Sequence, residues 1–235
     1  MHKFKFLYCF HILVLSAILS NAHALEVNIT KTMSHVNTAH NGKVIKIKRN
    51  QDQNNVLSGS YTKTSRKCPP FCVQPMKVAP GVETVGEAEV LLFIKDKVNH
   101  GSGVLIDART ASWFKKATIP GSINIPFNTF NKDSSDLLKV SALAKLGVTT
   151  KKETRDEKSL IDQMMSMIQD DTVELSSQWD FTKAKYVVLW CNGIWCEQSP
   201  RAIKGMLELG YPAEKIKYYR GGMQSWQSLG LTVVK

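Results

Sequence analysis

The sequence predicts an α/β domain built on a central parallel sheet. Two short apolar runs, residues 102–109 and 186–191, have the length and the Val, Ile and Leu content of buried strands. Apolar residues recur at helical spacing in residues 84–99 and 199–210, so helices are expected beside these strands. Strands that alternate with helices are typical of parallel sheets, because a crossover helix links neighbouring parallel strands.

The remaining elements of the domain follow from turn residues and apolar spacing. A proline-glycine turn leads into a short strand at residues 119–127. Residues 215–222 predict a strand that ends at two glycines, and residues 223–230 predict a short final helix. No internal repeat is visible, so one domain is expected over residues 82–235.

A longer, charged region at residues 128–182 interrupts this alternation. Apolar residues at helical spacing predict helices within it, at residues 137–147 and 157–169. The second of these helices holds a cluster of methionines. We expect these methionines to pack in a helix core rather than to bind metal.

Residues 1–24 have the three-part plan of a secretory signal. A short basic head precedes an apolar run, and small residues at Ala22 and Ala24 mark a cleavage site. The apolar run is short for a hydrocarbon core of about 30 Å, and no later stretch is long and apolar enough to span a bilayer. We therefore expect cleavage after Ala24, a periplasmic or secreted protein, and no stable membrane span.

The chain is basic, with 31 Lys and Arg against 20 Asp and Glu. Removal of Lys3 and Lys5 with the signal lowers the formal charge from +11 to +9. The other lysines are scattered among acidic residues, and no nucleic acid partner is expected outside the cytoplasm. This pattern is typical of a solvated, mildly basic surface that attracts small anions.

Residues 25–81 form a polar extension before the domain. Apolar residues alternate with lysines at residues 42–50, which predicts one or two edge strands. The rest of the extension has too few apolar residues to build a core of its own. We expect it to be ordered in part by docking onto the domain.

Four cysteines remain after the signal is removed, and they form two close pairs. Disulfides persist in exported proteins, so Cys68 and Cys72 are expected to form a local disulfide or a redox relay to the second pair, Cys191 and Cys196. No histidine motif at zinc spacing accompanies either pair, so no metal is expected. No cofactor is expected either.

Cys191 ends an apolar strand and precedes a helix, at the edge of a parallel sheet where ligand sites lie. Backbone N–H groups at such a loop lower the pKa of a thiol and bind anions, so Cys191 is the expected nucleophile. Three roles remain open for Cys196. It is a resolving thiol, a partner in a structural disulfide that silences the site, or the nucleophile itself.

The ordered combination of motifs resembles the rhodanese-like family of sulfurtransferase domains. It rests on VLIDAR, IPGSINIPF, YVVLWC, AIKGMLELGY and YYRGGMQSWQSLGLTVV, which lie within residues 82–235 and are interrupted by residues 128–182. The resemblance implies a doubly wound parallel sheet with helices on both faces, and a reactive cysteine at Cys191. The loop is about two residues longer than the usual family loop, lacks its Arg-Ser, and Thr118 stands where many members have His. The CNGxWCxQSP loop and the CPPFC segment look like an exported branch of the family.

The loop after Cys191 supplies the candidate substrate-binding residues. These are the four residues that follow the cysteine and the nearest cation in the sequence: Asn192, Gly193, Ile194, Trp195 and Arg201. Ser199 is expected to cap the following helix. Asp107 and Arg109 resemble the family's Asp-x-Arg and are expected to serve the structure of the sheet rim.

The resemblance implies a sulfurtransferase in which the Cys191 thiolate accepts sulfane sulfur from thiosulfate or a persulfide. A thiol acceptor or cyanide would then remove that sulfur. Two alternatives remain open: a redox protein whose two cysteine pairs exchange electrons with a periplasmic partner, and a non-catalytic module that binds a partner. A phosphatase or arsenate reductase is disfavoured, because neither Cys191 nor Cys196 begins a Cys-x5-Arg loop.

Overall fold

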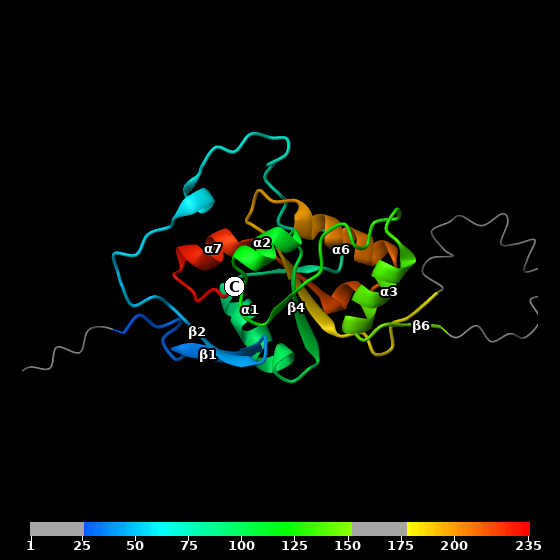
Figure 1. The fold of residues 1–235 in the computed structure, drawn as a ribbon, viewed down its shortest axis with the longest axis horizontal. Coiled ribbons are helices and arrows are strands. Elements are labelled where there is room, and N and C mark those ends of the chain that lie inside the picture. Colours follow the sequence, from blue (N-terminus) through cyan, green and yellow to red (C-terminus); the bar gives the residue numbers. More distant parts are fainter. Residues whose placement is uncertain (1–25, 152–177) are drawn as a thin grey trace, which may run out of the picture.

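The computed structural model describes residues 26–151 and 178–235 (Figure 1). The expected signal at residues 1–24 and the expected helix at residues 157–169 lie outside the described residues.

A five-stranded parallel sheet forms the centre of the domain, in the order β3-β9-β8-β4-β5. Its strands are β3 (Glu83–Val85), β4 (Gly103–Asp107), β5 (Ser122–Asn124), β8 (Tyr186–Trp190) and β9 (Ile216–Tyr219). The central strand β8 pairs with β4 on one side and β9 on the other. β4 and β8 were expected from continuous apolar runs, which are typical of strands covered on both faces. The predicted α/β class is confirmed.

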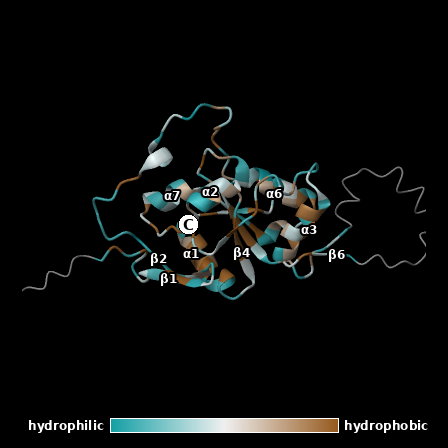
Figure 2. Ribbon diagram, viewed as in Figure 1, coloured by the Kyte–Doolittle hydropathy of each residue, from teal (hydrophilic) through white to brown (hydrophobic). Residues whose placement is uncertain are grey.

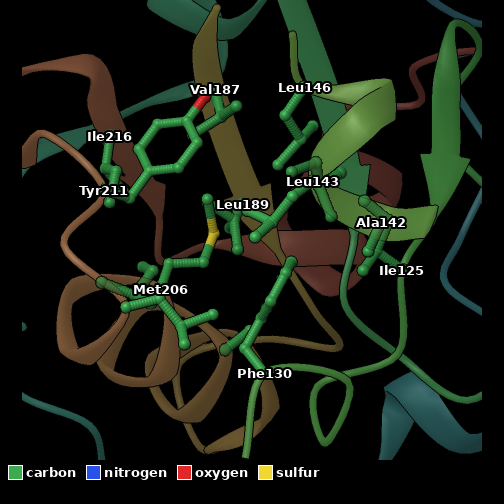
Figure 3. Packing of buried hydrophobic residues seen from close by; sticks show 14 of the residues in the cluster. Ile125, Phe130, Ala142, Leu143, Leu146, Val187, Leu189, Met206, Tyr211 and Ile216 are labelled. Carbon is green, nitrogen blue, oxygen red and sulfur yellow. The ribbon is translucent and has the colours of Figure 1, made fainter. Parts of the chain in front are cut away.

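Alternate side chains of the strands face two separate cores, because successive residues of a strand point to opposite faces. On one face, Val187 and Leu189 pack with α3 (Asp136–Lys145) and α6 (Gln198–Glu208), as Figure 3 shows. On the other face, side chains of β4, β8 and β9 pack with α1 (Glu87–Phe93) and α7 (Gly222–Ser228). Helices therefore cover both faces of the sheet, and Figure 2 shows the apolar residues gathered along its strands.

The helix expected over residues 84–99 is only partly correct. Its first residues form the edge strand β3, which pairs with β9, and a helix begins at Glu87. The Glu89 carboxylate accepts a hydrogen bond from the Gly86 N–H at 3.0 Å, which marks this start. A π-helical turn, Ile94–Val98, follows α1. The strand pairing depends on β9, more than 130 residues away, so local spacing does not reveal it.

Three short helical segments were not expected from the sequence: α2 (Ala111–Lys116) and the 3-10 turns Gly59–Thr62 and Ala213–Lys215. None of the residues of α2 is buried, and its six residues are too few to show apolar residues at helical spacing.

The strands expected near residues 42–50 do not extend the central sheet. Residues 43–48 form one strand, β2 (Lys43–Lys48), which pairs with the unexpected strand β1 (His35–His40) in a separate antiparallel hairpin. Asn41 and Gly42 both have positive φ, of 48° and 74°, as a two-residue hairpin turn requires. Val36 and Ile47 of the hairpin are buried in the core that also holds α1 and α7. The extension thus shares the core of the domain.

The described residues on either side of residues 152–177 pair with each other and pack on the domain. β6 (Thr149–Thr150) pairs with β7 (Trp179–Asp180) in an antiparallel arrangement. The Trp179 side chain is buried in the core that holds α3 and α6. The helix expected at residues 137–147 is confirmed as α3.

Candidate active site

Cys191 lies directly after the central strand β8, and its side chain is 2% exposed. The Ser199 hydroxyl donates a hydrogen bond to its Sγ at 3.0 Å. Its thiol lies 3.3 Å from the carbonyl oxygen of Cys196, to which it donates. The expected strand-end position of Cys191 is therefore observed. The expected cap at Ser199 is wrong: this fully buried hydroxyl contacts Cys191, and the N-cap of α6 is Glu197.

The cysteine loop, residues 191–197, is held by the start of α7. The Cys191 carbonyl accepts from the Met223 N–H at 2.9 Å, and the Asn192 carbonyl accepts from the Gln224 N–H at 3.0 Å. Gly222 makes this approach possible, because it has a φ of +56° and a Cβ there would collide with the Cys191 carbonyl. Within the loop, the Cys196 N–H donates to the Gly193 carbonyl at 2.9 Å.

Cys191 and Cys196 are both free thiols, and their environments push their pKa values apart. The hydrogen bond from the Cys191 thiol, aided by the backbone N–H groups of Asn192 and Gln198, lowers the pKa of Cys196 to about 7. Burial, and next the adjacent Cys196, raises the pKa of Cys191. Near neutral pH the pair therefore loses one proton, and the negative charge lies mainly on Cys196. Strand-end geometry alone had favoured the thiolate at Cys191.

Asn192 links the cysteine loop to the rim of the sheet. Its Oδ1 accepts from the Tyr61 hydroxyl at 2.9 Å and from Arg109 Nη1 at 3.4 Å. Arg109 forms a two-point pair with Asp107, with Nη2–Oδ2 at 2.6 Å and Nε–Oδ1 at 2.9 Å. Asp107 and Arg109 were expected to support the rim of the sheet. Arg109 also supports the cysteine loop, because it donates to Asn192. Tyr61 was missed, because nothing local in the polar extension distinguishes it.

Trp195 is covered by the extension. The Arg66 guanidinium lies 4.0 Å from the centroid of its ring, and Phe71 packs edge-on at 5.3 Å between ring centroids. The indole N–H donates to Gln224 Oε1 at 3.0 Å. Ile194 is 40% exposed, and its carbonyl accepts from the Gln74 N–H at 2.8 Å. Residues 66–74 thus lie over the cysteine loop.

Arg201 lies in the first turn of α6 and has partners other than the thiols. Its guanidinium lies 4.6 Å from the centroid of the Phe127 ring, and Nη1 is 3.8 Å from Glu197 Oε1. The side chain is 45% exposed. Arg201 therefore lies on the surface of α6. The arginine that contacts the cysteine loop is Arg66.

Cys68 and Cys72 form a disulfide with a Cα–Cα distance of 4.7 Å. Cys68 is exposed and Cys72 is half-buried. Phe71, which lies between the two cysteines, contacts Trp195, and Gln74, which follows Cys72 by two residues, contacts Ile194. The disulfide therefore closes a turn that rests on the cysteine loop.

Within residues 26–151 and 178–235, no three His, Cys, Asp or Glu side chains are placed to hold a metal ion. No helix in this part of the chain is both long and apolar enough to cross a bilayer.

A comparison with protein families gave a match that includes the cysteine loop. The model of the rhodanese-like domain matches residues 93–229. The chain belongs to the rhodanese-like family. The match includes the whole cysteine loop and the helices that hold it.

Solved structures that resemble the chain include two described as single-domain sulfurtransferases. The human one is 19% identical, with 62% of this chain and 96% of that chain covered and a TM-score of 0.34. The one from Saccharomyces cerevisiae is 18% identical, with coverages of 63% and 91% and a TM-score of 0.33. A Bacillus halodurans protein is 20% identical, with coverages of 62% and 71% and a TM-score of 0.36. A comparison with curated proteins gave no match.

Proposed function

We propose that the protein is an exported sulfurtransferase that carries sulfane sulfur as a persulfide on Cys191. The observation that carries this proposal is the pair of neighbouring free thiols at the end of the central strand, in which the pKa of Cys196 is lowered. Membership of the rhodanese-like family supports it. The substrate class is a small sulfur-containing anion such as thiosulfate, with a thiol as the acceptor.

The loading step uses both thiols. The Cys191 sulfur attacks the outer sulfur of thiosulfate, while its proton passes to the neighbouring Cys196 thiolate. The bond between Cys191 Sγ and the outer sulfur forms, and the sulfur–sulfur bond of thiosulfate breaks. The products are the Cys191 persulfide anion, the neutral Cys196 thiol and sulfite. Cys196 thus serves as the base for a cysteine whose own pKa is raised by burial.

The unloading step returns the pair to its starting state. An acceptor thiolate attacks the outer sulfur and leaves as a persulfide anion, the electron pair of the broken sulfur–sulfur bond returns to Cys191, and the proton held by Cys196 passes back to Cys191. Burial of both cysteines keeps water and stray oxidants from the persulfide between the two steps.

Intact-mass measurement tests whether Cys191 carries the sulfur atom. Intact mass of the reduced protein should rise by one sulfur atom after thiosulfate treatment, and cyanide should remove that mass. Cys191→Ser should abolish the adduct, and Cys196→Ser should retain it at alkaline pH. An adduct that disappears only in Cys196→Ser would show that the carrier is Cys196.

A thiol–disulfide redox protein is the second candidate function, and the Cys68–Cys72 disulfide beside the cysteine loop favours it. In this reaction the Cys191/Cys196 dithiol is oxidised to a disulfide while the Cys68–Cys72 disulfide is reduced to a dithiol. The two functions differ in a simple assay. Equilibration of the disulfides with glutathione, without any transfer of sulfur from thiosulfate, would select the redox protein.

Export is part of the proposal and rests on residues 1–24 of the sequence. N-terminal sequencing of the protein recovered from the periplasm or the medium should begin at Leu25. Recovery of the full-length chain from the cytoplasm would contradict export.

A further inference from the structure

Tyr218 lies beside the cysteine pair on the same face of the sheet. It is in β9, where it pairs with Leu189 of β8, and both side chains belong to the core under α6. Cys191 follows Leu189 by two residues, which directs its side chain to that face as well. The contact of Cys191 with Ser199 of α6 agrees with this direction. The Tyr218 side chain is fully buried.

The Tyr218 hydroxyl has no hydrogen-bond partner among the described residues. The other buried tyrosines are bonded: Tyr61 donates to Asn192 Oδ1, Tyr211 to the Lys185 carbonyl at 2.6 Å, and Tyr219 to Glu87 Oε1 at 2.9 Å. A buried hydroxyl without a partner is unfavourable, so its retention calls for an explanation.

The cysteine pair acts on Tyr218 electrostatically. Burial raises the pKa of Tyr218, and negative charge at Cys191 and then at Cys196 raises it further, against the nearby Arg220. Tyr218 therefore remains a neutral hydrogen-bond donor across the physiological range of pH. A neutral hydroxyl close to a developing negative charge is suited to stabilise that charge.

We infer that the Tyr218 hydroxyl donates a hydrogen bond to the outer sulfur of the Cys191 persulfide. This inference rests on the proposed function. Loading lengthens the Cys191 side chain by one sulfur atom, which carries the negative charge on the face of the sheet that also holds the phenol. The unpartnered hydroxyl gains its acceptor only in the loaded protein, so Tyr218 favours the persulfide over the free thiol.

Tyr218→Phe tests the inference by removing one oxygen atom. Reduced protein is brought to equilibrium at fixed ratios of thiosulfate to sulfite, and intact mass gives the loaded fraction. The equilibrium constant for loading should fall about tenfold or more in Tyr218→Phe, since hydrogen bonds to charged groups are the strong ones. The melting temperature of the unloaded variant should equal or exceed that of the wild type.

Tyr211→Phe is the matched control. Tyr211 is a buried tyrosine of the same core, shown in Figure 3, but its hydroxyl is already bonded to the Lys185 carbonyl. This variant should melt at a lower temperature and should keep the wild-type equilibrium constant for loading.

Each outcome decides something different. If Tyr218→Phe loads as the wild type does, the inference is wrong and the proposed function stands. If its unloaded form melts at a lower temperature, the hydroxyl already has a partner and the inference is also wrong. If the wild-type protein takes up no sulfur, both the proposed function and the inference are refuted.

Discussion

Substitution of Cys196 by serine tests the proposed role of Cys196 as the base that deprotonates Cys191. In the wild type the pKa of Cys196 is lowered to about 7, so the proposed base becomes deprotonated near neutral pH. In Cys196→Ser that base is gone, and Cys191 must ionise by itself in a buried site that raises its pKa above the ordinary value of 9.0. At pH 7 at most about one thiol in 100 is then ionised, since each unit of pKa is a factor of about 10.

The loss in rate is smaller than the loss in ionisation. A fully ionised Cys191 is a stronger nucleophile than a Cys191 whose proton is still passing to Cys196. With a Brønsted coefficient of about 0.4–0.5, two units of pKa recover about a factor of 10. We expect persulfide loading by Cys196→Ser to be about tenfold slower than by the wild type at pH 7. The difference should shrink as the pH rises toward 9.

Single-turnover loading with thiosulfate, quenched and read by intact mass between pH 5.5 and about 9.5, measures this profile. The wild-type rate should fall as the pH drops through 7, because protonation of the pair removes the base. Cys196→Ser should show its rise at least two units higher. The base role of Cys196 would be refuted if the variant loaded at the wild-type rate with the wild-type pH profile.

Two further predictions concern the elements around the cysteine loop. Replacing both Cys68 and Cys72 by serine should lower the free energy of unfolding by about 2 kcal/mol, from the loss of a short closed loop, while the rate of reductive recycling stays unchanged. Slower recycling at an unchanged melting temperature would instead support a redox relay. Gly222→Ala should cost about 1–3 kcal/mol in denaturant unfolding, because its φ is +56° and the added Cβ meets the Cys191 carbonyl. An unfolding free energy equal to that of the wild type would contradict the packing described at this glycine.

Much of the fold follows from patterns that are local in the sequence. The apolar runs of β4 and β8 and the helical spacing of α3 and α6 each lie within about a dozen residues, so a single pass along the chain identifies them. The position of Cys191 is local in the same sense, because it depends only on where one strand ends and the next helix begins. The family motifs in and around the cysteine loop are also local in the sequence, and they indicate a candidate function.

The strands β1, β2 and β3 show where local patterns fail. Alternation at residues 42–50 predicted the strand that forms β2 but not β1, and only the tertiary structure decides whether a strand joins the central sheet or forms a hairpin of its own. Residues 83–85 become a strand because β9 offers them unpaired backbone groups. Strand pairing is a contact between distant segments, so the identity of the partner cannot be read from the residues themselves.

The chemistry of the site was decided almost entirely by tertiary contacts. Tyr61 reaches Asn192 across 131 positions of the sequence, and Arg66 of the extension covers Trp195. The pKa values of Cys191 and Cys196 depend on burial and on the neighbours of each thiol, and folding alone creates both. The sequence by itself determined which residue types are present and which element carries them. The tertiary structure decided which thiol holds the charge, because electrostatic energies depend on distances and burial rather than on the order of residues.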